Sequence, residues 1–327
     1  MDFSDDKRAA DGFRQLLGEV FSDMVRRMDW NDLQKVKDAL PLISMSYKNG
    51  LRYACHGVRT GWSQPANQCA YVYLYFAYHS YIVYRSMQHP ALKALCREGT
   101  GRKLKVCSIG GGPGSDLAGL TKFLKNTYRF AQFDSLVLDK YREWKKTWRL
   151  ISHHLPYLDG DVTYSRCNLV EDRHLSAADR AFVRQADLLT LIRSFLAVSA
   201  FYRRDPRTGH LLRTILRDLK AGALVLYVDN LCYGDQQFKQ EFALPAGLTL
   251  LAEFPGPVEM PIGLMPHNIQ RYINILEYNP MRKCDLLVQL FKKQSPDWFG
   301  ESTNFQPYQP RQSASKPSKD RCECTIL

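Results

Sequence analysis

The sequence has no apolar run long enough to cross a membrane. Its longest apolar stretch, Ala70 to Tyr84, contains six tyrosines and His79. It falls short of the roughly 20 apolar residues that a bilayer crossing requires. The start of the chain, MDFSDDKRAADGF, also lacks the basic and apolar regions of a secretory signal. We therefore expect no transmembrane helix and a chain on the cytoplasmic side.

Cysteine and histidine pairs at metal-binding spacing are missing as well. The nine cysteines include no C-x-x-C pair, and neither Cys55 and His56 with Cys69 nor the adjacent His153 and His154 repeats a zinc-ligand spacing. An odd number of scattered cysteines is typical of a reducing compartment. The pattern disfavours a structural metal and indicates a cytoplasmic protein.

Acidic residues are fewer than basic ones, 33 against 45, which gives a formal charge of +12 and a pI of about 9.2. This excess favours an anionic partner, and a nucleic acid or an acidic lipid surface would each meet that condition. Hydrophobic residues make up 45% of the 327, enough for a normal buried core. No internal repeat indicates a solenoid or a propeller.

Three kinds of composition follow one another along the chain. Residues 1–100 have helical periodicity, and residues 101–294 consist of short apolar runs separated by helical stretches, which is typical of a mostly parallel sheet with both faces covered. Residues 295–327 are rich in Ser, Pro, Gln and Lys. We predict a helical N-terminal cap or lid, an α/β domain and a flexible tail. The predicted helices cover 12–28, 31–45 and 67–87, and the predicted strands cover 104–109, 135–138, 162–164, 188–192, 223–228, 248–254 and 284–291.

The tyrosine-rich stretch has a helical period. Tyr71, Tyr75, Tyr78 and Ile82 stand at i, i+4, i+7 and i+11, which places them on one face of a helix. Such a face packs into a core in most proteins, and it can also form a lid whose tyrosines touch a ligand. Both interpretations stay open from the sequence.

A glycine-rich turn follows the first predicted strand. The run from Lys105 to Asp116, KVCSIGGGPGSD, is an apolar strand that leads through Gly110, Gly112 and Gly114 into a helix. Glycines allow the backbone to approach a ligand closely, and the start of a helix offers free N–H groups to its polar atoms.

The second predicted strand ends in Asp139, where a carboxylate can accept both hydroxyls of a ribose. The dinucleotide fingerprint needs a third glycine or alanine, but Ser115 and Leu117 stand at the two positions where it would fall. NAD and FAD are therefore disfavoured. A purely structural turn with a capping or ion-paired Asp139 is the alternative to a nucleotide site.

These motifs resemble those of the class I methyltransferases, which have a seven-strand Rossmann-like fold and use S-adenosyl-L-methionine (SAM). The resemblance covers residues 103–293. It implies that Gly110, Gly112 and Gly114 lie against the methionine and ribose portion of SAM, and that Asp139 holds the ribose. Cys167-Asn168-Leu169 is similar to the adenine-contact motif, which makes Asn168 a candidate partner of the adenine amine. The last two predicted strands fit the reversed final hairpin of this class.

The resemblance also implies that the end of the fourth strand, Ile192-Arg193-Ser194-Phe195, faces the transferred methyl group. This sequence departs from the Asn/Asp-Pro-Pro-aromatic motif of enzymes that methylate exocyclic nitrogens, and Cys232 lacks the context of a cytosine C5 nucleophile. Arg193 could hold an anionic acceptor, and Asp229 could act as a base or bind a substrate cation. Ser194 is a third catalytic candidate. Structural ion pairs remain the alternative for Arg193 and Asp229.

Residues 140–149 alternate basic and aromatic side chains, as RNA-binding surfaces do. Trp144 and Trp148 share one helical face, however, so we expect them to pack inward and the basic residues to form a solvated face. The chain also faintly resembles a eukaryotic group that includes a fungal ribosomal RNA uridine methyltransferase. A methyltransferase with an unidentified acceptor is therefore the main hypothesis, with an RNA base methyltransferase and a non-catalytic SAM-binding scaffold as alternatives.

The chain ends in Cys324-Thr325-Ile326-Leu327, which satisfies the C-a-a-X signal for prenylation, with a leucine that indicates a geranylgeranyl group. Cys322 is placed to carry a palmitoyl chain, and basic residues upstream could meet anionic lipid. A protein geranylgeranyltransferase would then be the modifying partner, and the enzyme would work at a cytoplasmic membrane face. A chance match of four residues is the alternative.

Overall fold

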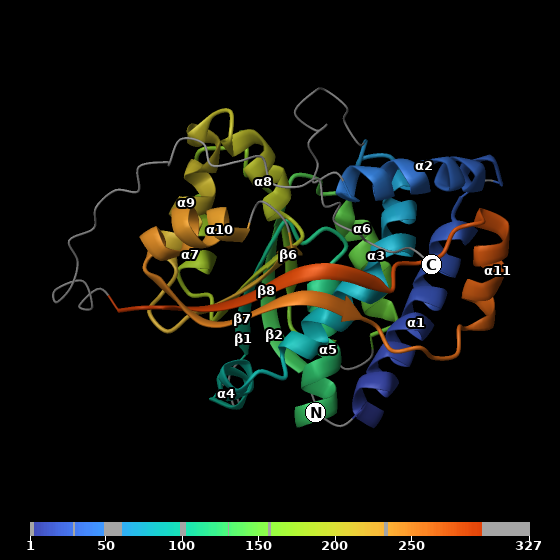
Figure 1. Ribbon diagram of the computed structural model, residues 1–327, viewed down its shortest axis with the longest axis horizontal. Coiled ribbons are helices and arrows are strands. Elements are labelled where there is room, and N and C mark those ends of the chain that lie inside the picture. The colour runs from blue at the N-terminus through green and yellow to red at the C-terminus, as the bar shows by residue number, and fades with distance from the viewer. Residues whose placement is uncertain are drawn as a thin grey trace.

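One mixed sheet forms the centre of the protein, and helices cover both of its faces (Figure 1). The computed structural model describes residues 3–28, 30–48, 61–98, 103–129, 131–155, 158–231 and 235–295. The predicted tail, with Cys322 and Cys324, and the candidate Cys232 lie outside the described residues.

The strand order is β3-β2-β1-β5-β6-β8-β7, and β4 also pairs with β2. All pairings are parallel except those of β8, which runs antiparallel between β6 and β7. β3 and β4 pair with successive parts of β2, so together they occupy one edge position and the described sheet has seven positions. The strands are β1 (Leu104–Ile109), β2 (Ala131–Asp139), β3 (Leu158–Asp159), β4 (Val162–Arg166), β5 (Leu188–Ile192), β6 (Leu224–Asn230), β7 (Leu248–Glu259) and β8 (Lys283–Lys293).

Burial explains the two kinds of strand pattern. Every residue of β5 and β6 is buried, because helices cover both faces of the sheet at its centre. These strands are apolar except for Thr190 in β5 and the last two residues of β6, Asp229 and Asn230. β7 lies at the sheet edge and alternates between more and less exposed residues. A parallel centre with an antiparallel hairpin at one edge is therefore the architecture.

Two apolar cores lie on opposite faces of the sheet. The larger core joins the N-terminal helices and the helix after β1 to one face, and the smaller core joins the helices after β4, β5 and β6 to the other. The helices are α1 (Phe3–Arg26), α2 (Trp30–Lys48), α3 (Pro65–Ser86), α4 (Pro90–Glu98), α5 (Ser115–Tyr128), α6 (Trp144–His153), α7 (Ala177–Val183), α8 (Phe195–Tyr202), α9 (His210–Asp218), α10 (Asp235–Gln237) and α11 (His267–Leu276), with short helical turns at Pro206–Gly209, Phe238–Ala243 and Leu244–Ala246.

The tyrosine-rich helix α3 is central. It packs against α1, α2 and α5, and its residues are buried all round from Gln68 to Tyr84 except for the half-buried Tyr71. The hydroxyl of Tyr78 donates to the carbonyl oxygen of Val258 in β7 at 2.6 Å, so this buried polar group has a hydrogen-bond partner. The core-packing interpretation of this helix is confirmed, and a contact of its tyrosines with a ligand stays a prediction. Among the described helices, including α3, none is both long and apolar enough to cross a membrane.

The predicted fold class, an α/β protein with N-terminal helices and a reversed final hairpin, is confirmed. The predicted ranges of β1 and β5 match the observed strands. The predicted strand 248–254 is too short, since β7 continues through Pro255 and Pro257 to Glu259. Proline is tolerated there because an edge strand needs no ladder hydrogen bond on its outer side.

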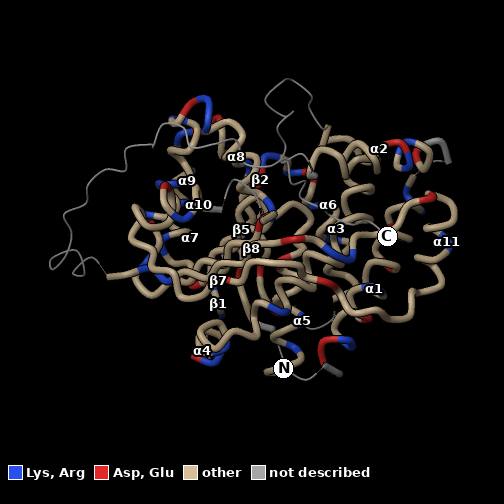
Figure 2. The backbone as a smooth tube through the Cα atoms, viewed as in Figure 1, with Lys and Arg blue, Asp and Glu red and all other residues tan. Residues whose placement is uncertain are grey.

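Helix α6 has the two faces predicted for residues 140–149. Trp144 and Trp148 are buried, whereas Lys145, Lys146 and Arg149 are exposed. Figure 2 shows basic and acidic residues interspersed over the outer helices in this view. The positive charge of the described residues is therefore spread over several elements.

Candidate functional site

The turn between β1 and α5 contains three glycines in the left-handed region. Gly110, Gly112 and Gly114 have φ angles of +60°, +51° and +82°. A Cβ at Gly110 would lie 2.5 Å from the Cβ of Ser194, and one at Gly114 would lie 2.5 Å from the Trp148 ring. Both the backbone conformation and the space around it therefore require glycine at these two positions.

The carboxylate of Asp139 lies beside this turn. Its Oδ2 accepts a hydrogen bond from the backbone N–H of Gly112 at 3.0 Å, and its Oδ1 accepts one from the N–H of Tyr141 at 2.9 Å. Burial raises the pKa of Asp139 to about 6, and these two backbone donors oppose the rise. The end of β2 and the glycine turn thus form one polar corner at the carboxyl ends of adjacent strands.

A second buried carboxylate, that of Asp116, fixes the position of the turn. Oδ2 of Asp116, in the first turn of α5, accepts hydrogen bonds from the hydroxyls of Ser108 in β1, at 2.6 Å, and Thr190 in β5. Burial raises the pKa of Asp116, and the two hydroxyls oppose the rise. This residue joins α5 to two strands and so positions the turn.

Several buried polar atoms near the corner have no hydrogen-bond partner among the described residues, and two of them are donors. The two donors are Nδ2 of Asn168 and Oγ of Ser115, the first residue of α5. Oδ1 of Asn168 accepts from the N–H of Val170 at 3.1 Å. The preceding Cys167 donates its N–H to the carbonyl oxygen of Asp139 at 2.8 Å, which places Asn168 beside the corner. Buried polar groups without partners are costly, so both atoms mark a place for a polar ligand.

Arg193 and Ser194, at the end of β5, are held by protein groups. Arg193 is buried with φ of +58°; its guanidinium donates to Oδ1 of Asn230 and lies 5.5 Å from the ring centroid of Tyr47. The hydroxyl of Ser194 donates to the carbonyl oxygen of Ile109 at 2.9 Å. These contacts fasten the end of β5 to α2, β6 and β1.

Asp229, at the end of β6, caps helix α8. Its Oδ2 accepts from the N–H of Leu196 at 3.2 Å, and its Oδ1 accepts from the N–H of Asn230 at 2.9 Å. Burial raises the pKa of Asp229 to about 6, whereas the positive charge of Arg193 lowers it. Of the two interpretations from the sequence, these contacts favour the structural one, because Asp229 joins the end of β6 to the first turn of α8 and lies beside the charge of Arg193.

Aromatic side chains gather between the glycine turn and the end of β5. We call Tyr47, Trp62, Tyr71, Tyr75, His79 and Trp144 the aromatic cluster. Trp144 lies 3.8 Å from the position of a Cβ at Gly112, and its ring centroid is 5.5 Å from that of Tyr71. Tyr47 contacts Arg193 at the opposite end. The cluster thus spans the distance from the glycine turn to Arg193.

His79 is the most polar member of the aromatic cluster. Its ring stacks on Tyr75 with centroids 5.4 Å apart, and its Nε2 is buried without a hydrogen-bond partner among the described residues. Burial lowers the pKa of His79 well below its ordinary value, and the charge of Arg193 lowers it further. The imidazole is therefore neutral at pH 7 and has a hydrogen-bonding nitrogen to offer.

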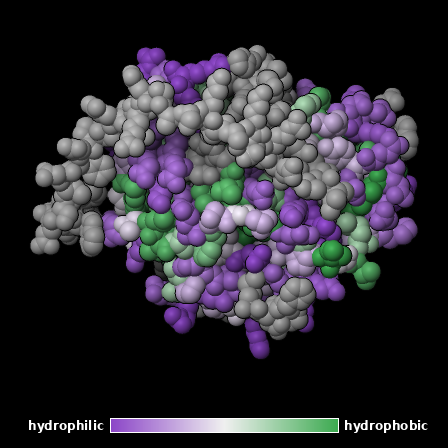
Figure 3. Space-filling view, in the orientation of Figure 1, coloured by the Kyte–Doolittle hydropathy of each residue, from purple (hydrophilic) through white to green (hydrophobic). Residues whose placement is uncertain are grey.

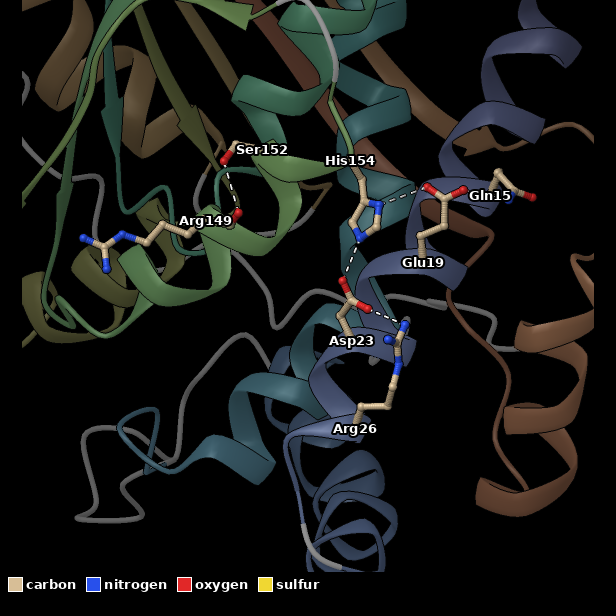
Figure 4. A network of polar contacts seen from close by, with 7 residues as sticks. All are labelled: Gln15, Glu19, Asp23, Arg26, Arg149, Ser152 and His154. Carbon is tan, nitrogen blue, oxygen red and sulfur yellow. Dashed lines mark hydrogen bonds and ion pairs between the residues drawn. The ribbon is translucent and has the colours of Figure 1, made fainter.

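Helix α1 is fastened to the carboxyl end of α6. The Nε2 atom of His154, just after α6, lies 2.8 Å from Oδ2 of Asp23 in α1, and its Nδ1 lies 3.6 Å from Glu19 (Figure 4). Arg26 contacts the other oxygen of Asp23 at 2.5 Å. Because α6 carries Trp144 and Trp148, this network ties the N-terminal helices to the glycine turn.

The structure brings together the predicted glycines, Asp139 and Asn168, and it places Ser194 against Gly110. Sequence reasoning missed Tyr47, His79 and the contacts of Trp144 and Trp148 with the glycines. A lone histidine on the face of Tyr71 and Tyr75 is the one signal that the sequence offered for His79. A separate apolar cavity of about 320 Å³ lies between the end of α3 and the β7–β8 hairpin, away from this site.

No protein-family model matches the chain, and no curated protein sequence matches it. Solved structures do match. A candidate RNA methyltransferase from Pyrococcus horikoshii is 11% identical, with a TM-score of 0.40, over 76% of this chain and 100% of that one. Magnesium protoporphyrin IX methyltransferase from Synechocystis, with bound SAM, is 6% identical, with a TM-score of 0.40, over 67% of this chain and 84% of that one. An O-methyltransferase family protein from Burkholderia thailandensis is 13% identical, with a TM-score of 0.35, over 81% of this chain and 73% of that one. Similarity at this level concerns architecture and does not specify function.

Proposed function

We propose that this protein is a SAM-dependent methyltransferase that binds its cofactor on the Gly110–Gly114 turn. The observation that carries the proposal is the hydrogen bond from Gly112 to Asp139, which sets a left-handed glycine turn beside a buried carboxylate. Glycines carry no side chain that would keep a ligand from the backbone of the turn, and the carboxylate has lone pairs left for ribose hydroxyls. Both residue types are those that the sequence resemblance assigns to SAM.

The place of this corner in the sheet supports the proposal. β1 pairs with β2 on one side and with β5 on the other, so the order of strands along the chain reverses at β1. Ligands of open α/β sheets bind at the carboxyl ends of the strands where this reversal occurs. The glycine turn follows β1 directly.

The two partnerless polar atoms fit an adenosine group. Oδ1 of Asn168 already accepts from the N–H of Val170, and the side-chain atom without a partner among the described residues is the donor Nδ2. We therefore assign Asn168 as a donor to an adenine ring nitrogen, which modifies its expected role as partner of the adenine amine. The hydroxyl of Ser115, at the start of α5, would serve another polar atom of the cofactor.

We assign the acceptor to the side of the glycine turn on which the aromatic cluster lies. Bound SAM supplies a methyl group on a sulfonium, and the protein has to exclude water and align the nucleophile. Trp144 and Tyr71 exclude water, and the neutral His79 offers its Nε2 as a hydrogen-bond partner that orients the acceptor. Arg193 holds the end of β5 in place through Tyr47 and Asn230.

RNA is the second candidate acceptor. The observation in its favour is that α6 exposes Lys145, Lys146 and Arg149 on the helix whose Trp144 reaches the glycine turn. A basic face next to the site would hold a phosphate backbone, and its affinity would fall steeply with salt.

Labelled SAM incubated with the protein and separate RNA, protein, lipid and metabolite fractions tests the proposed activity. Label should enter one fraction with the wild-type chain and should be lost with Asp139→Ala. Transfer to RNA that falls with added salt supports the second candidate. A chain that binds cofactor and labels no fraction is a scaffold, and that result would overturn the proposed activity.

A further inference from the structure

A short apolar loop projects from the protein between β7 and α11. Its residues Ile262, Leu264 and Met265 are 70%, 91% and 37% exposed. Figure 3 shows hydrophobic surface in green at the lower right, where Figure 1 places the segment between β7 and α11. Single exposed apolar side chains are common, but several close together indicate a contact surface. We call residues 260–266 the apolar loop.

The base of the apolar loop is fixed to the rest of the protein. The buried Met260 donates its N–H to the carbonyl oxygen of Arg282 at 2.9 Å, and the guanidinium of Arg14 donates to the carbonyl oxygen of Pro261. At the other end, Gln270 donates its N–H to the carbonyl oxygen of Pro266 at 2.9 Å. Because both ends are held, the exposure of the tip is a property of the fold.

The charges near the apolar loop are positive on balance. Arg14 pairs with Asp11 at 2.7 Å, and Arg282 and Lys283 both pair with Glu259, at 3.1 and 3.9 Å. Arg271 is exposed on the first turns of α11. Arg14 is buried and its charge is matched by Asp11, so the positive excess at the surface comes from Arg271, Arg282 and Lys283 against the one carboxylate of Glu259.

We propose that the apolar loop inserts into the surface of an anionic membrane. Apolar side chains with adjacent cations bind lipid headgroups and the acyl boundary together. A second copy of the chain fits less well, because three side chains cover far less than the roughly 800 Å² per partner of a stable protein interface. This surface is independent of the cofactor site and of any lipid on the tail.

Sedimentation of the full chain, produced in bacteria so that no prenyl group is present, with lipid vesicles tests the proposal. The protein should bind vesicles that contain phosphatidylserine and bind pure phosphatidylcholine vesicles more weakly. Ile262→Ser with Leu264→Ser should reduce binding by about tenfold or more, since burying one such side chain contributes more than one factor of ten. Arg271→Gln should reduce binding by roughly fivefold. The control Leu251→Ser alters an apolar residue on β7 that is 42% exposed, and it should bind as wild type does.

Three results would overturn the inference: no binding of the wild-type chain to either vesicle, equal binding to both, or a double variant that binds as wild type does. Light scattering tests the alternative that the loop binds a second copy of the chain. If the wild-type chain is a dimer that the double variant converts to a monomer, the loop is an interface between copies. Retained binding of S-adenosylhomocysteine by the double variant shows that it is folded. Because cofactor binding is measured apart from vesicle binding, the proposed function and the membrane proposal can fail independently.

Discussion

The backbone N–H of Gly112 donates to Oδ2 of Asp139 at 3.0 Å, and this bond joins the turn after β1 to the end of β2. It holds the carboxylate beside the glycines without the help of a ligand. Burial disfavours the ionised form of this carboxylate and raises its pKa to about 6. Two residues that sequence reasoning singled out separately therefore act as one unit.

The first prediction concerns the pH dependence of cofactor binding. Ribose hydroxyls bind the ionised form of Asp139 better than the protonated form, so the affinity for S-adenosylhomocysteine should fall as the pH drops through about 6. In the absence of ligand the sign is opposite: a raised carboxyl pKa means that stability from this group is greatest below the ordinary pKa of 3.8 and is lost as the pH rises through about 6.

Calorimetry across this pH range would measure the effect on binding. Asp139→Asn should bind weakly at every pH, with the dependence removed. Asp229→Asn is the control, because burial raises the pKa of Asp229 to about 6 as well but its oxygens cap α8. A dependence that disappears in the Asp229 variant and persists in the Asp139 variant would contradict the assignment.

The second prediction compares two glycines of the turn. Gly112→Ala should lower the free energy of unfolding by about 1–2 kcal/mol, the cost of a left-handed non-glycine residue. Gly114→Ala should cost roughly 1–3 kcal/mol more, because its Cβ would lie 2.5 Å from the Trp148 ring, whereas a Cβ at Gly112 meets Trp144 at 3.8 Å. Urea denaturation of both variants checks this. Equal losses in the free energy of unfolding would show that the Trp148 ring moves away from a Cβ at Gly114 without a cost in stability.

The sequence predicts those parts of the site that are local along the chain. The glycine turn and the acidic end of β2 carry their own signals, since backbone conformation and position after a strand decide them. The aromatic cluster carries only part of such a signal, because the helical period places Tyr71 and Tyr75 on one face but does not indicate which residues that face meets. Tyr47 meets Arg193 only because α2 folds over the end of β5, and Asp229 becomes a helix cap only when β6 lies beside β5. Contacts that depend on tertiary packing cannot be found from periodicity.

A third prediction concerns the link between α1 and α6. Asp23→Asn should lower the free energy of unfolding by roughly 0.5–1.5 kcal/mol at pH 7, since its half-buried contact with His154 would lose a charge-assisted hydrogen bond. The hydrogen bond to His154 lowers the pKa of Asp23, so this stability is present above the ordinary pKa of 3.8 and disappears as the pH falls through the lowered value.

Denaturation at several pH values measures this difference. Arg26→Ala is the control: this side chain is 75% exposed, and its loss should change stability by less than about 0.5 kcal/mol. If Asp23→Asn and the wild type have the same stability at pH 7, the link contributes nothing.

The fourth prediction concerns the end of the chain. In eukaryotic cells Cys324 should carry a geranylgeranyl group, and Cys324→Ser should move the protein to the soluble fraction, since each buried methylene of the lipid contributes about 0.8 kcal/mol. Cys322→Ser should have a partial effect if that position carries an acyl chain. Intact-mass measurement decides the matter: an unmodified Cys324 that still carries residues 325–327 would refute the prediction.

Calorimetric titration of S-adenosylhomocysteine tests the central claim, a cofactor site at the glycine turn and Asp139, most directly. The wild-type chain should bind, and Asp139→Ala should bind more weakly by about 1.5–3 kcal/mol, the loss of charge-assisted hydrogen bonds to the ribose. Asp134→Ala is the matched control on the same strand, because its carboxylate faces Lys103 and the N–H of Asp161. Its affinity should stay within about 0.5 kcal/mol of wild type. A folded Asp139→Ala with unchanged affinity would contradict the site described here.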